Sequence, residues 1–366
     1  MPTTKLWIHI GMPKTGTSSL QELFSWNREK LAEHGYLYPD FGSPQHFPLV
    51  RSLAREVGSP AGFPHGGADL PIEGIKETIH SAVLRRKITN VVLSSEFFFD
   101  YPGLTPGRPE FPIDQAIPYL RGVASLLRET FPDYEAYVVV WLRRQDHWLM
   151  SMYNNAVKVA NYKRDFDVFY KHQVAPWYGR ILDQWGDIFG KEKLKIFVYE
   201  KDNRGLDVVP EFLRLIEFPE HVILDKPNHH VREGNIGLSR ELLIIKRELN
   251  RSMPEHMPGL RQSIEDLVFS LAKQEAEVGK RNVPIISSEQ RRSILQKFSG
   301  ENQHVLERFL DSSRPGLFME PLPEDTDWEK VQSISGDMLL RIFAPLLLSQ
   351  AKRIRSLENR LKRETL

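Results

Sequence analysis

The chain has 366 residues, of which 41% are apolar and 27% charged, so it can bury a core and form one large or two ordinary domains. Because 49 Lys and Arg nearly balance 48 Asp and Glu, the net charge of +1 argues against a bulk binder of nucleic acid or anionic membrane, although not against a local basic pocket. The chain has no cysteine, which excludes thiol nucleophiles, disulfides, iron–sulfur clusters and thiolate zinc sites.

Short apolar runs alternate with amphipathic stretches along the first two thirds of the chain. The apolar runs predict buried strands at residues 6–10, 90–94, 136–142 and 194–199. The amphipathic stretches predict helices at residues 18–34, 146–159 and 208–216. Uninterrupted apolar strands separated by helices are typical of a parallel sheet that is covered on both faces. We therefore expect an α/β fold in which helices flank a parallel sheet.

Two stretches between these elements, residues 40–71 and 100–118, are rich in Gly and Pro. Irregular stretches of this length are usually functional lids or acceptor walls, or else disordered, and both interpretations stay open here. Beyond residue 235 the sequence turns mostly helical and predicts an extension that packs on the sheet. Its helices are expected at residues 238–250, 260–278, 288–298 and 302–310.

The terminal stretch 350–366 carries six Lys or Arg, two Glu and apolar residues at heptad-like spacing. Two heptads are short for a coiled coil, so a solvated basic helix is the preferred interpretation and self-association through this helix the alternative. The start of the chain lacks a signal-peptide pattern, and the most apolar late segment is interrupted by Arg341 and Pro345. We expect a cytoplasmic protein without a transmembrane segment.

The strongest local pattern is IHIGMPKTGTSSL at residues 8–20. A buried strand leads into a turn rich in Gly and hydroxyl residues, and a helix follows. Backbone N–H groups and the positive end of the helix dipole then point at one place, which predicts a phosphate or sulfate site. Lys14 adds a point charge, and Gly16 permits close approach of the backbone. A helix cap made by the Thr-Ser-Ser run, without any ligand, is the alternative.

The same loop is close to a Walker A motif without being one. Gly11 and Gly16 have the GxxxxG spacing, but Thr17 stands where the nucleotide-binding lysine is expected. Lys14 lies two residues before the second glycine instead. A P-loop kinase or nucleotidase is therefore an alternative, and it would also need a magnesium-binding carboxylate at a strand end.

Residues 13–21, PKTGTSSLQ, resemble the 5′-phosphosulfate loop of the sulfotransferases that use 3′-phosphoadenosine 5′-phosphosulfate (PAPS). The form of the loop is more similar to bacterial and carbohydrate-type members than to cytosolic aryl-type ones. The resemblance implies that the loop holds the 5′-phosphate and that its lysine reaches toward the sulfuryl group. The implied donor-binding residues are Lys14, Thr15, Gly16, Thr17, Ser18 and Ser19.

A second anion site is expected where the third strand ends. Arg143 stands at that carboxyl end, which faces the ligand crevice of a parallel sheet, and Ser151 follows eight residues later. The planar fork of arginine pairs two phosphate oxygens. In sulfotransferases an Arg and a Ser at this spacing bind the 3′-phosphate, so the resemblance implies that role for both residues. The adjacent Arg144 is expected to be solvated or in a surface ion pair.

A carboxylate, Glu96, follows the second strand and precedes three phenylalanines, residues 97–99. Partial desolvation would raise its pKa and make it a better base near neutral pH. In carbohydrate-type sulfotransferases a glutamate at the corresponding point accepts the proton of the acceptor hydroxyl, and the resemblance implies this role here. A carboxylate paired with a nearby Arg or Lys is the alternative. The phenylalanines and the Gly/Pro stretches are candidates for the walls of a sugar-binding cleft.

The fourth strand ends in FVYEKD, which resembles a family segment whose tyrosine lies near the adenine. This match implies a donor contact for Tyr199, with core packing as the alternative. The resemblance as a whole covers about residues 5–235, through three motifs in the family order.

The motifs together predict a PAPS-dependent sulfotransferase with a P-loop-like sheet, in which Lys14 and Glu96 are catalytic and no metal takes part. The acceptor would be a hydroxyl on a carbohydrate or glycolipid, and one product would be adenosine 3′,5′-bisphosphate. We expect a core at 1–235, a helical extension at 236–349 and a basic helix at 350–366. No nucleic-acid partner is expected. A non-catalytic nucleotide-binding scaffold is the second alternative, although binding alone does not require the base Glu96.

Overall fold

The computed structural model describes residues 3–58, 70–100, 113–200, 208–225, 236–252, 258–277, 284–310 and 313–324, with short helical pieces between 336 and 356. The chain divides into two compact units, each assembled from separate stretches. The first unit comprises Met1–Met152, Asp167–His229 and Glu289–Pro323. The second comprises Tyr153–Phe166, His230–Ser288 and Glu324–Leu366. The boundaries that the sequence suggested at residues 235 and 349 stay predictions.

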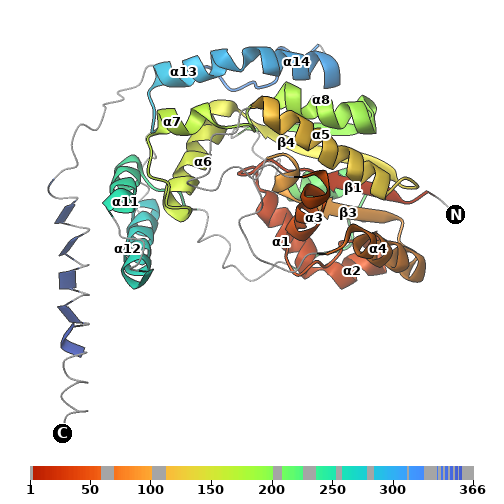
Figure 1. The fold of residues 1–366 in the computed structure, drawn as a ribbon, viewed down its shortest axis with the longest axis horizontal. Coiled ribbons are helices and arrows are strands. Elements are labelled where there is room, and N and C mark those ends of the chain that lie inside the picture. The colour runs from red at the N-terminus through yellow and green to blue at the C-terminus, as the bar shows by residue number, and fades with distance from the viewer. Residues whose placement is uncertain are drawn as a thin grey trace, which may run out of the picture. The chain divides into compact units, whose positions relative to one another are not determined.

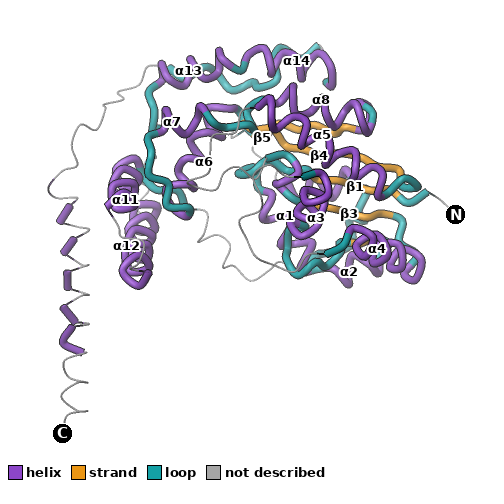
Figure 2. The backbone as a smooth tube through the Cα atoms, in the orientation of Figure 1, coloured by secondary structure: helices purple, strands orange, loops and turns teal. Residues whose placement is uncertain are grey.

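The first unit contains a five-stranded sheet with the order β2-β3-β1-β4-β5, of which Figure 1 labels β3, β1 and β4. All described strand pairs in this sheet are parallel. Figure 2 shows strands of the sheet in orange and the helices in purple. The strands are β1 (Lys5–His9), β2 (Tyr36–Leu37), β3 (Asn90–Ser94), β4 (Glu135–Arg143) and β5 (Leu194–Tyr199). The four longer strands match the predicted ones to within one residue at each end. The predicted fold class, an α/β fold with a parallel sheet flanked by helices, is confirmed.

The two strands beside β1 determine where a ligand can bind. β1 lies between β3 and β4, and the chain reaches β3 by way of β2 on one side before it crosses to β4 on the other. Such a reversal of strand order opens a crevice at the carboxyl ends of the strands, which is where open α/β sheets bind ligands. The loop after β1, the turn after β3 and the end of β4 meet at this edge.

Helices of the first unit cover the sheet (Figure 1). They are α1 (Thr17–Trp26), α2 (Arg28–Glu33), α3 (Phe47–Val57), α4 (Ile72–Arg86), α5 (Ile113–Thr130), α8 (Tyr178–Phe189), α9 (Val208–Leu215) and α14 (Ser299–Phe309). Short 3-10 helices occupy Glu96–Phe98, here η1, and Lys191–Lys193. Three further helices begin in one unit and continue into the other: α6 (Gln145–Val159), α7 (Phe166–Lys171) and α13 (Ser288–Lys297).

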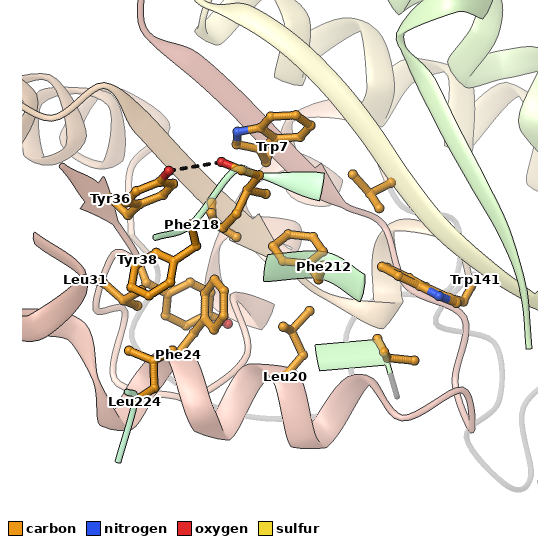
Figure 3. Close-up of a cluster of buried hydrophobic side chains, with 14 residues drawn as sticks. Trp7, Leu20, Phe24, Leu31, Tyr36, Tyr38, Trp141, Phe212, Phe218 and Leu224 are labelled. Atoms are coloured by element: carbon orange, nitrogen blue, oxygen red, sulfur yellow. Dashed lines mark hydrogen bonds between the residues drawn. The ribbon is translucent and has the colours of Figure 1, made fainter. Parts of the chain in front are cut away.

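One face of the sheet is closed by an aromatic and aliphatic cluster (Figure 3). Leu20 and Phe24 of α1 meet Phe212 of α9 and the strand residues Trp7 and Trp141, and each of these side chains is at most 4% exposed. Phe24 and Phe212 pack edge to face with their ring centroids 5.6 Å apart. Burying a side chain of this size stabilises a fold by about 1.5–3 kcal/mol. The cluster therefore fixes the first turn of α1, and the loop before it, against β1 and β4.

The predicted helix at residues 18–34 is two helices, because Asn27 interrupts it. The side-chain amide of Asn27 donates to the carbonyls of Leu23 (2.8 Å) and Asp225 (2.9 Å). Its Oδ1 accepts the backbone N–H of Asp225 at 2.8 Å. A side chain that bonds to a distant segment on both of its polar atoms competes with the continuous helix.

The expectation of an irregular chain at residues 40–71 is wrong for its middle part, which forms α3. Leu49, Val50, Leu53 and Ala54 are fully buried at helical spacing. A proline is compatible with the first turn, and Gly58 ends the helix in a left-handed conformation. The second Gly/Pro stretch turns helical at Ile113, where α5 begins, and residues 101–112 lie outside the described residues.

The second unit is helical in its described part. Its main elements are α11 (Arg240–Ser252) and α12 (Pro258–Glu277). Lys246 is 1% exposed, and its ammonium group bonds Asn250 (2.6 Å) and Asn161 (3.0 Å) and forms an ion pair with Glu265 (3.4 Å). The four late helices lie within three residues of their predicted bounds. Most of the stretch 350–366 lies outside the described residues. Among the helices that the structure describes, none is long and apolar enough to cross a bilayer.

Candidate functional site

Three residues of the loop between β1 and α1 have a left-handed backbone conformation. Gly11 (φ 52°) and Gly16 (φ 87°) are left-handed, and so is Lys14 (φ 67°), where a side chain makes this region costly. A side chain on Gly11 would place its Cβ 3.3 Å from both the Cα of Glu96 and the Cγ2 of Thr17. The loop thus passes directly against the turn after β3. A left-handed non-glycine residue held in such a place is typical of functional sites.

The N-terminus of α1 has no side-chain cap. Gly16 occupies the cap position, no side chain bonds the free amides there, and the first turn carries no acidic residue. Ser18 and Ser19 are exposed, and the hydroxyl of Thr17 points elsewhere. The alternative that the Thr-Ser-Ser run merely caps the helix is therefore wrong. The positive end of the helix dipole remains available to an anion.

Three backbone carbonyl groups of the loop each accept a hydrogen bond from a side chain, one from within the loop and two from outside it. The hydroxyl of Thr15 donates to the carbonyl of Met12 at 2.7 Å. The indole N–H of Trp148 donates to the carbonyl of Pro13 at 2.9 Å, and Nη1 of Arg143 donates to the carbonyl of Lys14 at 2.8 Å. These three hydrogen bonds restrict the backbone of the loop to one conformation.

Glu96 begins η1 directly after β3 and faces the loop. Its Oε1 accepts the hydroxyl of Thr17 at 2.6 Å. Burial raises the pKa of Glu96, while the Thr17 hydrogen bond and the charge of Lys14 oppose that rise. Burial lowers the pKa of Lys14, Glu96 opposes this, and Arg143 lowers it further. The structure thus brings Lys14, Thr17, Glu96 and Arg143 together, as their places at three strand ends suggested.

Arg143 lies between the loop and the aromatic side chain that ends β5. Its guanidinium carbon is 5.6 Å from the centroid of the Tyr199 ring, and its own carbonyl accepts the hydroxyl of Tyr178. Burial lowers the pKa of Arg143. Tyr199 is half-buried and packs against the cluster of Figure 3, so it combines a core contact with a face toward Arg143. Ser151 is half-buried on α6, two turns after Arg143.

Arg144 differs from its prediction, because it is 4% exposed and its ion pair with Asp146 is buried, rather than solvated or paired at the surface. Its guanidinium forms two bonds to Asp146, at 2.8 Å and 3.1 Å, and donates to the carbonyls of Glu320 and Pro321. Arg291 bonds the same carboxylate at 2.9 Å. Burial alone would raise the pKa of Asp146, but the Arg144 hydrogen bonds and the surrounding positive charges lower it overall. This cluster joins the start of α6 to residues far along the chain.

Several residues of the site had no distinct sequence signal. Trp148 and Tyr178 donate hydrogen bonds to the backbone carbonyls of distant residues. No pattern in the sequence around either residue predicts these bonds. Asp100, 5% exposed, lies one turn beyond Glu96, and burial together with the charge of Glu96 raises its pKa to about 8. The spacing of these two carboxylates was visible in the sequence, but the burial of the second was not. Among the described residues no group of three or more His, Asp or Glu could hold a metal ion.

Comparison with known proteins gives distant matches. No family model matches the chain. An uncharacterized protein of Archaeoglobus fulgidus is 23% identical over 185 residues, which are 50% of this chain and 48% of that protein, so the chain matches about half the length of this curated relative. A sulfotransferase of Alicyclobacillus acidocaldarius, a solved structure, aligns with a TM-score of 0.35 and 16% identity over 77% of this chain and 98% of that one. Similarity this low assigns no activity to this chain.

Proposed function

We propose that this chain is a sulfotransferase that moves the sulfuryl group of PAPS to an acceptor hydroxyl on a carbohydrate or glycolipid. The observation that carries the proposal is the 2.6 Å hydrogen bond between Thr17 and Glu96. It joins an uncapped anion-binding loop to a carboxylate whose pKa is raised by burial. A loop that only binds an anion gains nothing from a carboxylate beside it, whereas a transfer to a hydroxyl needs a base there.

The residues present fit a donor with two separate phosphate positions. The amides at the start of α1, the hydroxyls at residues 17–19 and Lys14 suit the 5′-phosphosulfate. Arg143 with Ser151 suits the 3′-phosphate, and Tyr199 suits the adenine side. The charge of Arg143 lowers the pKa of Lys14 and so disfavours its charged form, a cost that an anion bound beside them would offset. When bound, PAPS supplies the sulfuryl group and leaves as adenosine 3′,5′-bisphosphate.

The roles of the two catalytic residues follow from their places. Glu96 accepts the proton of the acceptor hydroxyl as its oxygen forms a bond to sulfur. The bond between sulfur and the phosphate oxygen breaks, and the ammonium group of Lys14 stabilises the negative charge that grows on that oxygen. Thr17 keeps the carboxylate of Glu96 oriented. The loop and the turn hold these groups at fixed positions before the reaction begins.

Two measurements on the full chain test the proposal. Calorimetry should show adenosine 3′,5′-bisphosphate binding without added metal and more tightly than magnesium-ATP. Transfer from radiolabelled PAPS to a panel of carbohydrates, glycolipids and phenols should give a sulfate ester, and added EDTA should not change its rate. Tighter binding of magnesium-ATP would favour the P-loop kinase instead. Binding of the bisphosphate with no transfer to any member of the panel would favour the non-catalytic scaffold.

Self-association through residues 350–366 belongs to the same proposal as a secondary expectation. The apolar positions of this basic stretch would have to pair with those of a second copy. Sedimentation of the full chain should then show a dimer that a chain ending at residue 349 does not form. Equal monomeric masses for the two chains would remove this part of the proposal.

A further inference from the structure

The three consecutive phenylalanines after Glu96 have different surroundings in the fold. Phe98 and Phe99 are 0% exposed. Phe98 meets Trp185 edge to face at 6.1 Å, and Phe99 meets Tyr178 at 6.1 Å, so both belong to the core. Phe97, which directly follows the proposed base in the chain, is only half-buried, so the core does not enclose it fully.

A second half-buried phenylalanine lies against Phe97. Phe47, the first residue of α3, has its ring centroid 4.8 Å from that of Phe97, with the ring planes inclined by 57°. This distance and tilt lie within the favourable range for aromatic pairs. Two half-buried rings in contact thus lie where the start of α3 meets the turn that holds Glu96.

The neighbouring residue His46 fixes this pair relative to the base. The backbone N–H of His46 donates to the carbonyl of Ser94 at 2.8 Å, and the backbone N–H of Ser94 donates to Nδ1 of His46 at 3.0 Å. Because Nδ1 accepts, the ring proton is on Nε2, which donates to the carbonyl of Pro39 at 2.9 Å. His46 is 0% exposed, and burial lowers its pKa to about 3, so the ring stays neutral. The start of α3 is thus bonded to the end of β3, two residues before Glu96.

We propose that Phe47 and Phe97 form a stacking platform for the acceptor, on which the apolar face of a neutral sugar ring lies while one of its hydroxyls reaches Glu96. The inference rests on the proposed function and deepens it, because it names the class of acceptor and the residues that hold it. A pyranose ring presents C–H groups on one face and hydroxyls at its rim. Rigid aromatic rings bury such a face at a low cost in side-chain entropy, and a base at their edge meets the rim.

Binding of neutral disaccharides to the full chain, saturated with adenosine 3′,5′-bisphosphate, tests the platform without any turnover. Cellobiose, lactose and trehalose are the probes, 4-nitrophenol is the planar aromatic comparison, and saturation-transfer NMR and calorimetry detect binding. We expect at least one disaccharide to bind. Phe47→Ala and Phe97→Ala should each weaken its binding by about tenfold, since a stacked ring contributes about that factor. Phe97→Tyr should retain binding.

Two further variants separate stacking from folding. Phe47→Leu keeps an apolar side chain in α3 but removes the aromatic face, so it should weaken sugar binding while the melting temperature stays near that of the wild type. Trp26→Ala removes an aromatic ring that is 62% exposed elsewhere on α1, and it should leave binding unchanged. All variants should bind adenosine 3′,5′-bisphosphate as the wild type does.

The outcomes distinguish this inference from the proposed function. If no disaccharide binds, if both phenylalanine variants bind it like the wild type, or if only 4-nitrophenol depends on them, the platform for a sugar ring is overturned. Sulfation of 4-nitrophenol at an unchanged rate would then leave the sulfotransferase proposal standing. If the bisphosphate does not bind while sugar binding depends on Phe47 and Phe97, the donor proposal fails and the sugar platform stands.

Discussion

Two groups of charged side chains lie near the carboxyl end of β4, and they are built differently. In the first, the structural group, Arg144 and Arg291 bond the same fully buried carboxylate of Asp146. In the second, the loop group, Lys14 interacts with both Glu96 and Arg143, and each of the three has its pKa moved by burial. Well-bonded buried pairs hold elements together, whereas charges whose pKa is perturbed in a cleft are characteristic of functional sites.

The difference shows that the chemistry of a side chain does not by itself determine its role in the fold. Arg143 and Arg144 are adjacent in the sequence and have the same side chain. Arg143 donates to the loop carbonyl of Lys14, and Arg144 turns to Asp146 in the first turn of α6. We therefore expect changes in the loop group to reduce activity at little cost in stability, and changes in the structural group to reduce stability. Three predictions test this division, and a fourth concerns the buried carboxyl of Asp100 one turn beyond Glu96; they run from the largest expected effect to the smallest.

Glu96→Gln should lower the rate of transfer by about 10²- to 10⁴-fold, because an amide cannot accept the proton of the acceptor hydroxyl. The amide oxygen still accepts the Thr17 hydroxyl, and a desolvated carboxylate is removed, so the melting temperature should not fall. Steady-state kinetics and thermal unfolding measure the two effects. A variant that is folded, binds adenosine 3′,5′-bisphosphate and turns over at the wild-type rate would contradict the assignment of the base.

Asp146→Ala should destabilise the protein by about 3–5 kcal/mol, since it leaves two guanidinium groups without their shared carboxylate in a buried place. Urea unfolding at neutral pH measures the change. Glu29→Gln, which removes an exposed ion pair with Arg86, is the matched control and should have little effect. If the two variants unfold at the same urea concentration, the distinction between the two groups is lost.

Lys14→Ala should lower the rate by about 10²- to 10³-fold, because the charge that stabilises the leaving oxygen is gone. The positive charge of Lys14 also lowers the pKa of Glu96. Its removal should move the acidic limb of the profile of kcat/KM against pH toward higher pH. Lys14→Arg retains the charge and serves as the control, so its acidic limb should stay in place. An unchanged limb in the alanine variant would show that Lys14 does not act on the base.

Asp100→Asn should change the dependence of stability on pH. The pKa of Asp100 is about 8 in the folded chain and 3.8 as its ordinary value, so the folded state keeps a proton that the unfolded state releases. Its contribution to stability is fully present below pH 3.8 and is lost as the pH rises to about 8. The variant, which mimics the protonated form, should melt a few degrees above the wild type at pH 9 and near it at pH 4. Asp133→Asn, at an exposed position, is the control, and an equal gap at both pH values would contradict the assignment.

Much of the fold could be predicted because its signals are local. Each of the four longer strands is a short apolar run, and the loop after β1 contains its own glycines, lysine and helix start. Such patterns depend on residues within a few positions of one another. Arg143 and Glu96 were likewise found from their places at strand ends, and the structure brings them to one edge of the sheet. The site roles of these residues stay predictions until they are measured.

Contacts between distant residues account for what could not be predicted. Asn27 divides a continuous amphipathic pattern because its amide bonds Asp225, which lies 198 positions away. Helix α3 could not be predicted because glycines and prolines surround its apolar residues in the sequence. The bonds from Trp148 to Pro13 and from Tyr178 to Arg143 join segments that have no shared pattern.

By itself, the sequence determined the strands, the glycine-containing loop after β1 and the order of the motifs, because hydrophobic periodicity and glycine placement act over short distances. Only the tertiary structure decided which of three identical phenylalanines faces the surface, since the burial of Phe98 depends on Trp185 and that of Phe99 on Tyr178. It also decided that Arg144 is structural, because the carboxylate that binds it is shared with Arg291, more than a hundred residues away. Burial and charge pairing are properties of neighbours in space, and a sequence lists only neighbours along the chain.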